Sequence, residues 1–226
     1  MRLNKYIARC GICSRRKADE LIKAGLITIN GQVTQDLSYQ VTNDDKVKYQ
    51  GKILEISNTE LYAFHKPKGC LTSKTDPEGR KTIYDVLPKK LQNFSPIGRL
   101  DLNSEGLLLL TNDGELKRKF ELPKNQLPRT YKVRVFGKLS SNDKKLVESG
   151  ISIDGIQYRP AKINIIKPGV NSWLEITLTE GKNREIRKIF EYLGYPVSRL
   201  IRISYGNHDL GSLAAGETKI ILNVEF

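Results

Sequence analysis

The spacing of apolar residues changes near residue 57, and this change constrains the fold more than any other feature of the sequence. Up to about residue 56 the apolar positions fit two short helices and a small hairpin. From about residue 60 they fit longer strands separated by helices. The polar stretch Ser57-Asn58-Thr59 lies between the two patterns, as a hinge would. A chain of 226 residues is long enough for a small module and a medium one. We therefore expect two domains, residues 1–57 and residues 60–226.

The first domain is expected to contain two helices followed by a hairpin. Apolar residues at helical spacing predict a short first helix that breaks at Gly11. Ser14 can cap a second helix that runs to Ala24, and Gly25 is placed to end it. Asn30-Gly31 supplies two residues that tolerate positive φ between short alternating runs, which is typical of a β-hairpin.

Positive charge is high in the whole chain and concentrated at its start. The 38 Lys and Arg residues against 25 Asp and Glu give a formal net charge of +13, so we expect a polyanionic partner. Seven basic side chains lie in the first 25 residues: Arg2, Lys5, Arg9, Arg15, Arg16, Lys17 and Lys23. Such a run can be a solvated helix face or can bind phosphates. An acidic membrane surface would also attract it, but no apolar run approaches the ~18 residues of a spanning helix and no signal-peptide pattern is present. We expect a cytoplasmic protein that does not bind membranes.

The cysteines and histidines do not form the pattern of a metal site. Cys10 and Cys13 form a CxxC, but no second CxxC follows, and the two histidines, His65 and His208, are far apart in sequence. An odd count of three cysteines, with Cys70 as the third, favours reduced thiols. We expect these residues to pack in the structure and expect no metal.

The second domain is expected to be α+β with a mainly antiparallel mixed sheet, because many of its strands follow one another directly. The clearest strands are Leu61 to Phe64, Leu107 to Leu110, Thr130 to Val135, Ile163 to Ile166, Leu174 to Leu178 and Ile220 to Val224. Helical periodicity predicts helices at Glu115 to Glu121, Asn142 to Glu148 and Arg184 to Leu193.

The N-terminal pattern resembles a known RNA-binding module. The stretch MRLNKYIARCGICSRRKADELIKAGLITINGQV is similar to the S4 domain, in which two helices and a hairpin bind structured RNA through phosphate contacts. The resemblance implies RNA contact for Arg2, Lys5, Ser14, Arg15, Arg16 and Lys17.

A polar, glycine-flanked loop between two apolar strands contains the sequence Gly98-Arg99-Leu100-Asp101, and functional side chains are common in such loops. Taken alone, Asp101 could be a turn or cap residue paired with Arg99. However, GRLDLNSEGLLLLTNDGEL resembles the signature of pseudouridine synthases, of the branch that modifies ribosomal RNA and carries an S4 domain. The resemblance implies that Asp101 is the catalytic carboxylate.

Three further motifs occur in the order of that family: His65 to Gly69, Arg129 to Val133, and Glu180 to Lys188. The segments DPEGRKTIYDVLP, LPRTYKVRVFG and VSRLIRISYG resemble those of the members that modify large-subunit, 23S ribosomal RNA. The 16S, small-subunit members share the same layout and are the alternative. The resemblance thus implies site-specific isomerisation of uridine to pseudouridine in ribosomal RNA, or in a ribosomal assembly intermediate.

The implied reaction breaks the C1′–N1 glycosidic bond and rejoins the uracil through C5, so no cofactor is expected. Asp101 can add to the base or abstract a ribose proton, and both routes stay open. By the same resemblance, Arg187 would keep Asp101 ionised through a bidentate pair. Tyr131 would stack on the base and help remove the C5 proton, although a strand tyrosine can also be ordinary packing.

The remaining candidates surround these three residues. Arg99 is a candidate wedge that fills the space of the flipped uridine. Arg184 and Lys188 share helical spacing with Arg187 and can bind phosphate or form a solvated face. Leu213 is a candidate apolar wall of the uracil pocket.

Two other functions compete with this reading. A ribosome-assembly protein without catalysis would need only the S4-like module and the positive charge. A metal-dependent nuclease would need clustered carboxylates, and the sequence has no such cluster. The absence of a heptad pattern favours a monomer.

Overall fold

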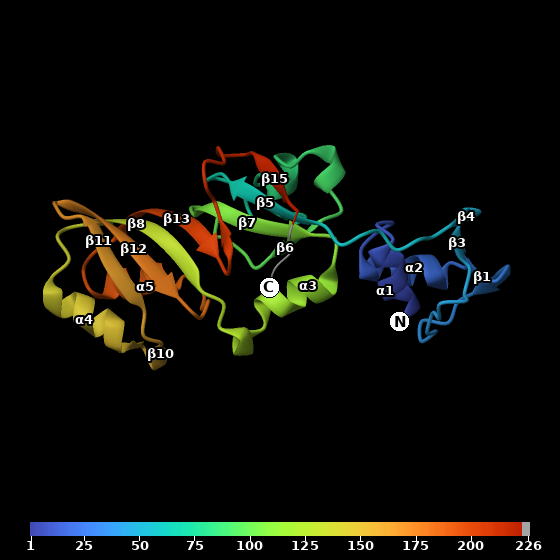
Figure 1. The fold of residues 1–226 in the computed structure, drawn as a ribbon, viewed down its shortest axis with the longest axis horizontal. Helices are drawn as coiled ribbons and strands as arrows, with labels where there is room; N and C mark the ends of the chain where they lie inside the picture. The colour runs from blue at the N-terminus through green and yellow to red at the C-terminus, as the bar shows by residue number, and fades with distance from the viewer. Residues whose placement is uncertain (223–226) are drawn as a thin grey trace.

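The computed structural model of the chain describes residues 1–222, which form an N-terminal unit (residues 1–54) and a C-terminal unit (residues 61–222) (Figure 1). The N-terminal unit contains α1 (Leu3–Arg9), α2 (Arg15–Lys23), β1 (Ile27–Ile29), β2 (Gln32–Thr34), β3 (Val47–Tyr49) and β4 (Lys52–Ile53). Its sheet has the order β2-β1-β3-β4 and every pair in it is antiparallel.

Local signals in the sequence correctly predict this unit. The Ser14 side chain accepts a hydrogen bond from the Lys17 N–H at 3.3 Å and caps α2. Gly25 follows the helix with a φ of +68°, which favours glycine. β1 and β2 form the hairpin around Asn30, whose φ is also positive. One hydrophobic cluster, which extends from Leu3 to Leu54, joins the helices to the sheet.

The C-terminal unit is built on one large sheet. Its strands are β5 (Leu61–Lys66), β6 (Ser95–Ile97), β7 (Glu105–Thr111), β8 (Arg129–Phe136), β9 (Ile151–Ile153), β10 (Ile156–Tyr158), β11 (Lys162–Lys167), β12 (Asn171–Leu178), β13 (Val197–Tyr205), β14 (His208–Asp209) and β15 (Thr218–Ile221). Its helices are α3 (Gly114–Glu121), α4 (Ser141–Ser149) and α5 (Glu185–Tyr192), with short 3-10 turns at Ile83–Asp85, Lys89–Leu91 and Pro123–Asn125.

The strand order of the large sheet is β11-β12-β8-β13-β7-β5-β15, with β14 paired to β13, β6 paired to β7, and β9–β10 as a separate hairpin. All the pairs in it are antiparallel except β13 with β7. The expected α+β class with a mainly antiparallel sheet is therefore confirmed. Each expected strand is present, although Asn223 and Val224 at the end of the last one lie outside the described residues.

The sequence analysis did not predict β13, which is the strand that joins the two halves of the sheet. β13 pairs with β7 only at Ile201 with Glu105 and at Arg202 with Gly106. A Cβ atom on Gly106 would lie 2.3 Å from the Arg202 carbonyl oxygen, so only glycine allows this crossing. The Arg202 side chain is buried and donates to the Leu107 carbonyl at 2.7 Å. A buried charged residue in the middle of a strand hides the alternation that identifies strands in a sequence.

The two halves of the C-terminal unit have separate cores. One cluster packs β8, β12 and β13 against α4 and α5, while two others surround β5 and β7. Figure 1 shows the half with β11, β12 and α4 at one end of the elongated molecule and the N-terminal unit at the other. The helices within residues 1–222 all lack the length and apolar character needed to cross a bilayer.

Candidate active site

A cavity of about 450 Å³ lies where the two halves of the C-terminal unit meet. The loop between β6 and β7 contributes Asp101 to its lining, and β8 contributes Tyr131. The structure therefore brings together two of the three expected catalytic residues, which are 30 positions apart in the chain. The Asp101 side chain is exposed and Tyr131 is half-buried, so both are accessible to a ligand in the cavity.

The loop that carries Asp101 is held by main-chain and side-chain hydrogen bonds along its length. The Gly98 N–H donates to Glu121 Oε1 at 2.7 Å, and Thr72 Oγ1 donates to the Leu100 carbonyl at 2.8 Å. The Gly69 N–H donates to the Leu102 carbonyl at 2.9 Å. A side chain on such a loop is held in one position before substrate arrives.

Lys66 at the end of β5 is the central anchor of this loop. Its side chain is fully buried, and Nζ donates to the carbonyl oxygens of Pro67, Asp101 and Ser104 at 3.1, 3.0 and 2.8 Å. Burial lowers the pKa of Lys66, and the neighbouring acidic groups, including Asp101, partly oppose this shift. The cation therefore fixes the backbone that carries the Asp101 carboxylate.

Arg187 anchors the same loop from the other side, which corrects the expected bidentate pair. Its guanidinium donates to the carbonyl oxygens of Asn103 at 2.9 Å and Val197 at 3.2 Å. Within residues 1–222, no hydrogen bond or ion pair joins Arg187 to the Asp101 carboxylate. Burial and the charge of Arg184 lower the pKa of Arg187, whereas the charge of Asp101 raises it. Arg187 thus ties the loop that carries Asp101 to β13 and acts on Asp101 through its field.

The apolar wall of the cavity comes from strand and helix residues that the sequence analysis did not single out. Leu178 on β12, Ile186 on α5 and Leu200 on β13 line the cavity together with Tyr131. Leu213, the residue expected here, instead packs with the cluster around β5 and β7. Its carbonyl oxygen lies 2.7 Å from His65 Nδ1, which fixes the loop away from the described cavity lining. The alternation of apolar Leu174, Ile176 and Leu178 with polar residues along β12 was the sequence signal that could have identified Leu178.

Cationic side chains surround the rim of the cavity. Arg99 and Arg184 line it and are exposed, whereas Lys188 is half-buried on α5 and does not belong to the lining. Arg129 also lines it, and its guanidinium donates to the Tyr205 hydroxyl at 3.0 Å while stacking 4.6 Å from that ring. A rim of this charge suits the phosphates that flank an inserted nucleotide.

A buried carboxyl group also lines the cavity, at the first turn of α5. Glu185 is 4 % exposed, and its Oε2 accepts a hydrogen bond from the Lys182 N–H at 2.9 Å. Burial, with a further contribution from Glu180, raises the pKa of Glu185 to about 7. The loop that carries Arg184 therefore ends beside a group that titrates near neutral pH.

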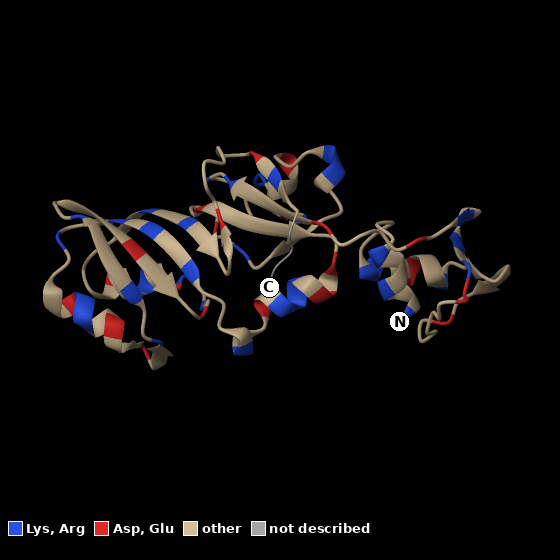
Figure 2. Ribbon diagram, viewed as in Figure 1, with Lys and Arg blue, Asp and Glu red and all other residues tan. Residues whose placement is uncertain are grey.

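Most of the basic residues expected to contact RNA lie on the surface of the N-terminal unit, and Figure 2 shows basic residues spread over both units. The exposed candidates are Arg2, Ser14, Arg15, Arg16 and Lys17. Lys17 forms an ion pair with Glu20 on the same helix at 2.6 Å. Lys5 is different, because it is half-buried and forms an ion pair with Glu115 of the C-terminal unit at 2.7 Å.

Comparisons with known proteins agree with this geometry. A family model described as RNA pseudouridylate synthase matches residues 60–192, and one described as S4 domain matches residues 1–47. An uncharacterized RNA pseudouridine synthase of Rickettsia conorii is 45% identical over 98% of this chain and 96% of its own length. Ribosomal large subunit pseudouridine synthase B of Bacillus subtilis is 37% identical over 96% of this chain and 91% of its own length. A crystal structure of a pseudouridylate synthase superposes with a TM-score of 0.70 at 28% identity, covering 98% of this chain and 96% of that one.

Proposed function

This chain belongs to the RNA pseudouridylate synthase family, and we propose that its substrate is a uridine of large-subunit, 23S ribosomal RNA. The enzyme isomerises uridine to pseudouridine. The substrate assignment is supported by relatives from Yersinia pestis and Bacillus subtilis that are named ribosomal large subunit pseudouridine synthase B, at 39% and 37% identity. The S4 domain at the N-terminus supports an RNA partner independently of those names.

In this proposal, Asp101 is the catalytic carboxylate. The observation that carries it is the placement of this exposed side chain in the cavity on a loop whose backbone is fixed by two buried or half-buried cations, Lys66 and Arg187. A carboxylate held in this way can attack the base or remove a ribose proton, and either step leads to cleavage of the C1′–N1 bond. The uracil then turns within the cavity and C5 bonds to ribose C1′. C5 loses its proton, N1 gains one, and Asp101 is restored either by release from the base or by return of the proton to the ribose.

Tyr131 and the apolar wall are proposed to hold the uracil during this turn. The Tyr131 ring is half-buried on β8 and lies among Leu178, Ile186 and Leu200, which together exclude water from one side of the base. To enter the cavity the uridine must leave its stack, and exposed Arg99 at the rim is suited to fill the vacated space. Arg184 at the same rim is suited to bind a flanking phosphate.

The test combines a deletion of this chain with a map of the pseudouridines in ribosomal RNA. We expect one uridine of the large-subunit RNA to lose its modification, and wild-type protein to restore it. Asp101→Asn should restore nothing, with purified enzyme at least about 10³-fold slower and RNA affinity retained. Asp154→Asn is the matched control, since Asp154 is exposed in a distant turn.

Each other outcome rejects one part of the proposal. Loss of a small-subunit modification would assign the enzyme to 16S ribosomal RNA, and an unchanged map would remove ribosomal RNA as the substrate. Restoration by Asp101→Asn would place the catalytic group elsewhere.

The proposal also covers the setting of the reaction. We propose a monomer, because the sequence has no heptad pattern. We propose cytoplasmic ribosomal RNA or an assembly intermediate as the partner. We also propose a domain boundary between residues 57 and 60, because the hydrophobic cluster of the N-terminal unit ends before it, at Leu54.

A further inference from the structure

We propose that Arg9 and Lys5 are positioning residues that hold the N-terminal unit in one orientation on the C-terminal unit, and so set the distance between RNA bound on α2 and Asp101. The four side chains Lys5, Arg9, Asp113 and Glu115 are called the interdomain clamp. This inference rests on the proposed function for its meaning in catalysis, although the clamp itself is a structural feature of the free protein.

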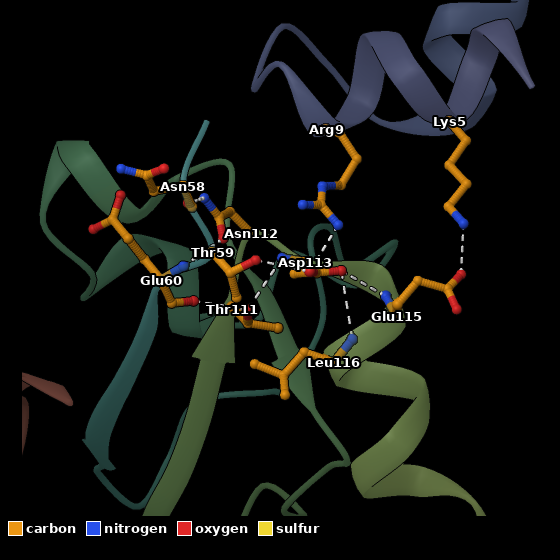
Figure 3. A network of polar contacts seen from close by, with 10 residues as sticks. All are labelled: Lys5, Arg9, Asn58, Thr59, Glu60, Thr111, Asn112, Asp113, Glu115 and Leu116. Atoms are coloured by element: carbon orange, nitrogen blue, oxygen red, sulfur yellow. Dashed lines mark hydrogen bonds and ion pairs between the residues drawn. The ribbon is translucent and has the colours of Figure 1, made fainter. Parts of the chain in front are cut away.

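The interdomain clamp consists of two ion pairs between α1 and the start of α3 (Figure 3). Arg9 Nη1 lies 2.7 Å from Asp113 Oδ2, and Lys5 Nζ lies 2.7 Å from Glu115 Oε1. The side chains of the Arg9 pair are only 20% and 11% exposed, whereas those of the Lys5 pair are 30% and 52% exposed. The Arg9 pair is therefore less screened by solvent and is the stronger restraint.

Asp113 is the residue at which the two units and the linker meet. Its Oδ1 accepts the Glu115 N–H at 2.8 Å and the Leu116 N–H, which caps α3. Its Oδ2 accepts the Thr59 hydroxyl at 2.8 Å as well as Arg9 (Figure 3). Burial tends to raise the pKa of Asp113, but these hydrogen bonds and the Arg9 charge lower it below its ordinary value. The carboxylate stays ionised at neutral pH and orients three parts of the chain at once.

Within residues 1–222, no hydrophobic cluster includes residues of both units. Among the described residues, the N-terminal hydrophobic cluster spans Leu3 to Leu54, and the other clusters contain only residues from Leu61 onward. Two units joined by a short linker move relative to one another unless a specific interface restrains them. Besides the clamp, Asn93 Nδ2 donates to the Gly11 carbonyl at 3.1 Å on the exposed surface. The orientation therefore depends on a few polar contacts, of which the Arg9 pair is the most buried.

The clamp is connected to the catalytic loop by a single strand. β7 follows the Asp101 loop at Glu105 and ends at Thr111, two residues before Asp113. It is buried along most of its length and spans about 20 Å at ~3.3 Å per residue. A buried central strand is stiff, so fixing α1 on Asp113 also fixes α1 relative to Asp101. Arg15 and Arg16 on α2 stay exposed for RNA while α1 faces the C-terminal unit.

The first test measures the free protein, so its result does not depend on the substrate. Small-angle X-ray scattering should give a larger radius of gyration for Arg9→Gln than for wild type. Arg9→Lys, which keeps the charge, should lie closer to wild type. Lys52→Gln, which removes an exposed charge on β4 of the N-terminal unit, is the matched control and should leave the radius unchanged.

A charge reversal supplies a second set of variants that tests the same contact. Lys5→Glu places two carboxylates opposite each other and should expand the molecule. Adding Glu115→Lys restores opposite charges and should return the radius toward the wild-type value. A merely local destabilisation by Lys5→Glu would not be repaired by a change in the other unit.

The second test measures catalysis on two RNAs: in vitro transcribed large-subunit ribosomal RNA, and a short hairpin that contains only the mapped uridine and reaches only the cavity. Wild type should have the higher kcat/KM on the long RNA. For Arg9→Gln, the ratio of kcat/KM on the long RNA to kcat/KM on the hairpin should fall about tenfold through a higher KM for the long RNA, while kcat on the hairpin stays unchanged. The reason is that the contact between α2 and the RNA loses effective concentration when the N-terminal unit is no longer held in place. Lys52→Gln should keep the wild-type ratio.

The outcomes separate this inference from the proposed function. An unchanged radius and an unchanged ratio in Arg9→Gln would overturn the clamp, and so would an equal loss on both RNAs. If wild type modifies neither RNA, free ribosomal RNA is not the substrate, while an expanded Arg9→Gln would still support the clamp as the restraint between the units.

Discussion

The two units of this molecule use cations in opposite ways. Arg15 and Arg16 project into solvent from α2, and neither has an ion pair within residues 1–222. Lys66, in contrast, is fully buried and binds three main-chain carbonyl oxygens of the catalytic loop. Exposed charges attract a polyanion over a distance and are screened by salt, whereas a buried cation is screened less and holds in place the groups that it contacts. We expect the first arrangement to provide affinity for RNA, and the second fixes the backbone of Asp101.

The strongest way to break this comparison is to remove the buried cation. Lys66→Met keeps most of the volume but removes the Lys66 donor from the carbonyl oxygens of Asp101 and Ser104, although the Ser104 N–H still donates to that of Asp101. We expect kcat to fall about 100-fold because the carboxylate loses its fixed position, while RNA affinity changes less than about twofold. Single-turnover kinetics and filter binding measure the two quantities. Lys68→Met is the matched control, because Lys68 is exposed two residues away.

A loss of RNA affinity in Lys66→Met equal to the loss of kcat would contradict the comparison, since it would mean that the buried cation also contributes to binding.

Differences between the two units also explain what the sequence could predict. The N-terminal unit depends on local signals, such as the Ser14 cap and the Asn30 turn, and these signals are read from neighbouring residues. The cavity depends on contacts between residues far apart in the chain. Asp101 and Tyr131 were found because they occur in motifs, but the anchoring role of Lys66 requires knowing that the end of β5 lies under the loop after β6.

Arg187 illustrates the same limit. Its place in the last motif predicted an acidic partner, but the guanidinium binds main-chain carbonyls of Asn103 and Val197. Every residue has a main-chain carbonyl, so the residue type does not show which carbonyl will bind an arginine. β13 was missed for a related reason. Arg202 is buried in the centre of β13, where it donates to the Leu107 carbonyl of the neighbouring strand, and this main-chain partner cannot be read from the sequence.

A second prediction concerns pH and the stability of the C-terminal unit. Burial raises the pKa of Glu185 from an ordinary value of 4.5 to about 7. The folded state thus binds the proton more tightly than the unfolded state, so its stabilising effect is complete below pH 4.5 and is lost as pH rises to about 7. We expect the free energy of unfolding to fall by on the order of 2 kcal/mol between pH 5 and 8 through this group.

Urea denaturation followed by the fluorescence of Trp173 measures this change, because Trp173 is the single tryptophan and lies on β12 of the same half. Glu185→Gln should remove most of the decline, whereas Glu191→Gln, exposed on the same helix, should keep it. An identical pH dependence in wild type and Glu185→Gln would show that another group is responsible.

A third prediction sharpens the role of the exposed cations. The double variant Arg15→Gln/Arg16→Gln should lower RNA affinity about tenfold and reduce the slope of log affinity against log salt by about two. At saturating RNA, kcat should remain that of wild type, because these residues do not touch the catalytic loop. Fluorescence anisotropy at several salt concentrations measures the slope. Lys138→Gln/Lys145→Gln removes the same charge near α4, at the far end of the molecule, and should leave the slope nearly unchanged (Figure 1).

The smallest expected effect separates two roles of one residue in the N-terminal unit. Ser14 caps α2 in the structure, and the resemblance to S4 domains also predicts an RNA contact for it. Ser14→Ala should destabilise the unit by about 1 kcal/mol, seen as about fivefold faster thiol labelling of Cys10 and Cys13, which pack against its core. Ser14→Asp should keep the cap and the labelling rate of wild type, because aspartate is an equally good cap. If Ser14 also lies against an RNA phosphate, Ser14→Asp should still weaken RNA binding through repulsion; unchanged affinity would limit Ser14 to capping and leave the RNA contact to the arginines that follow it.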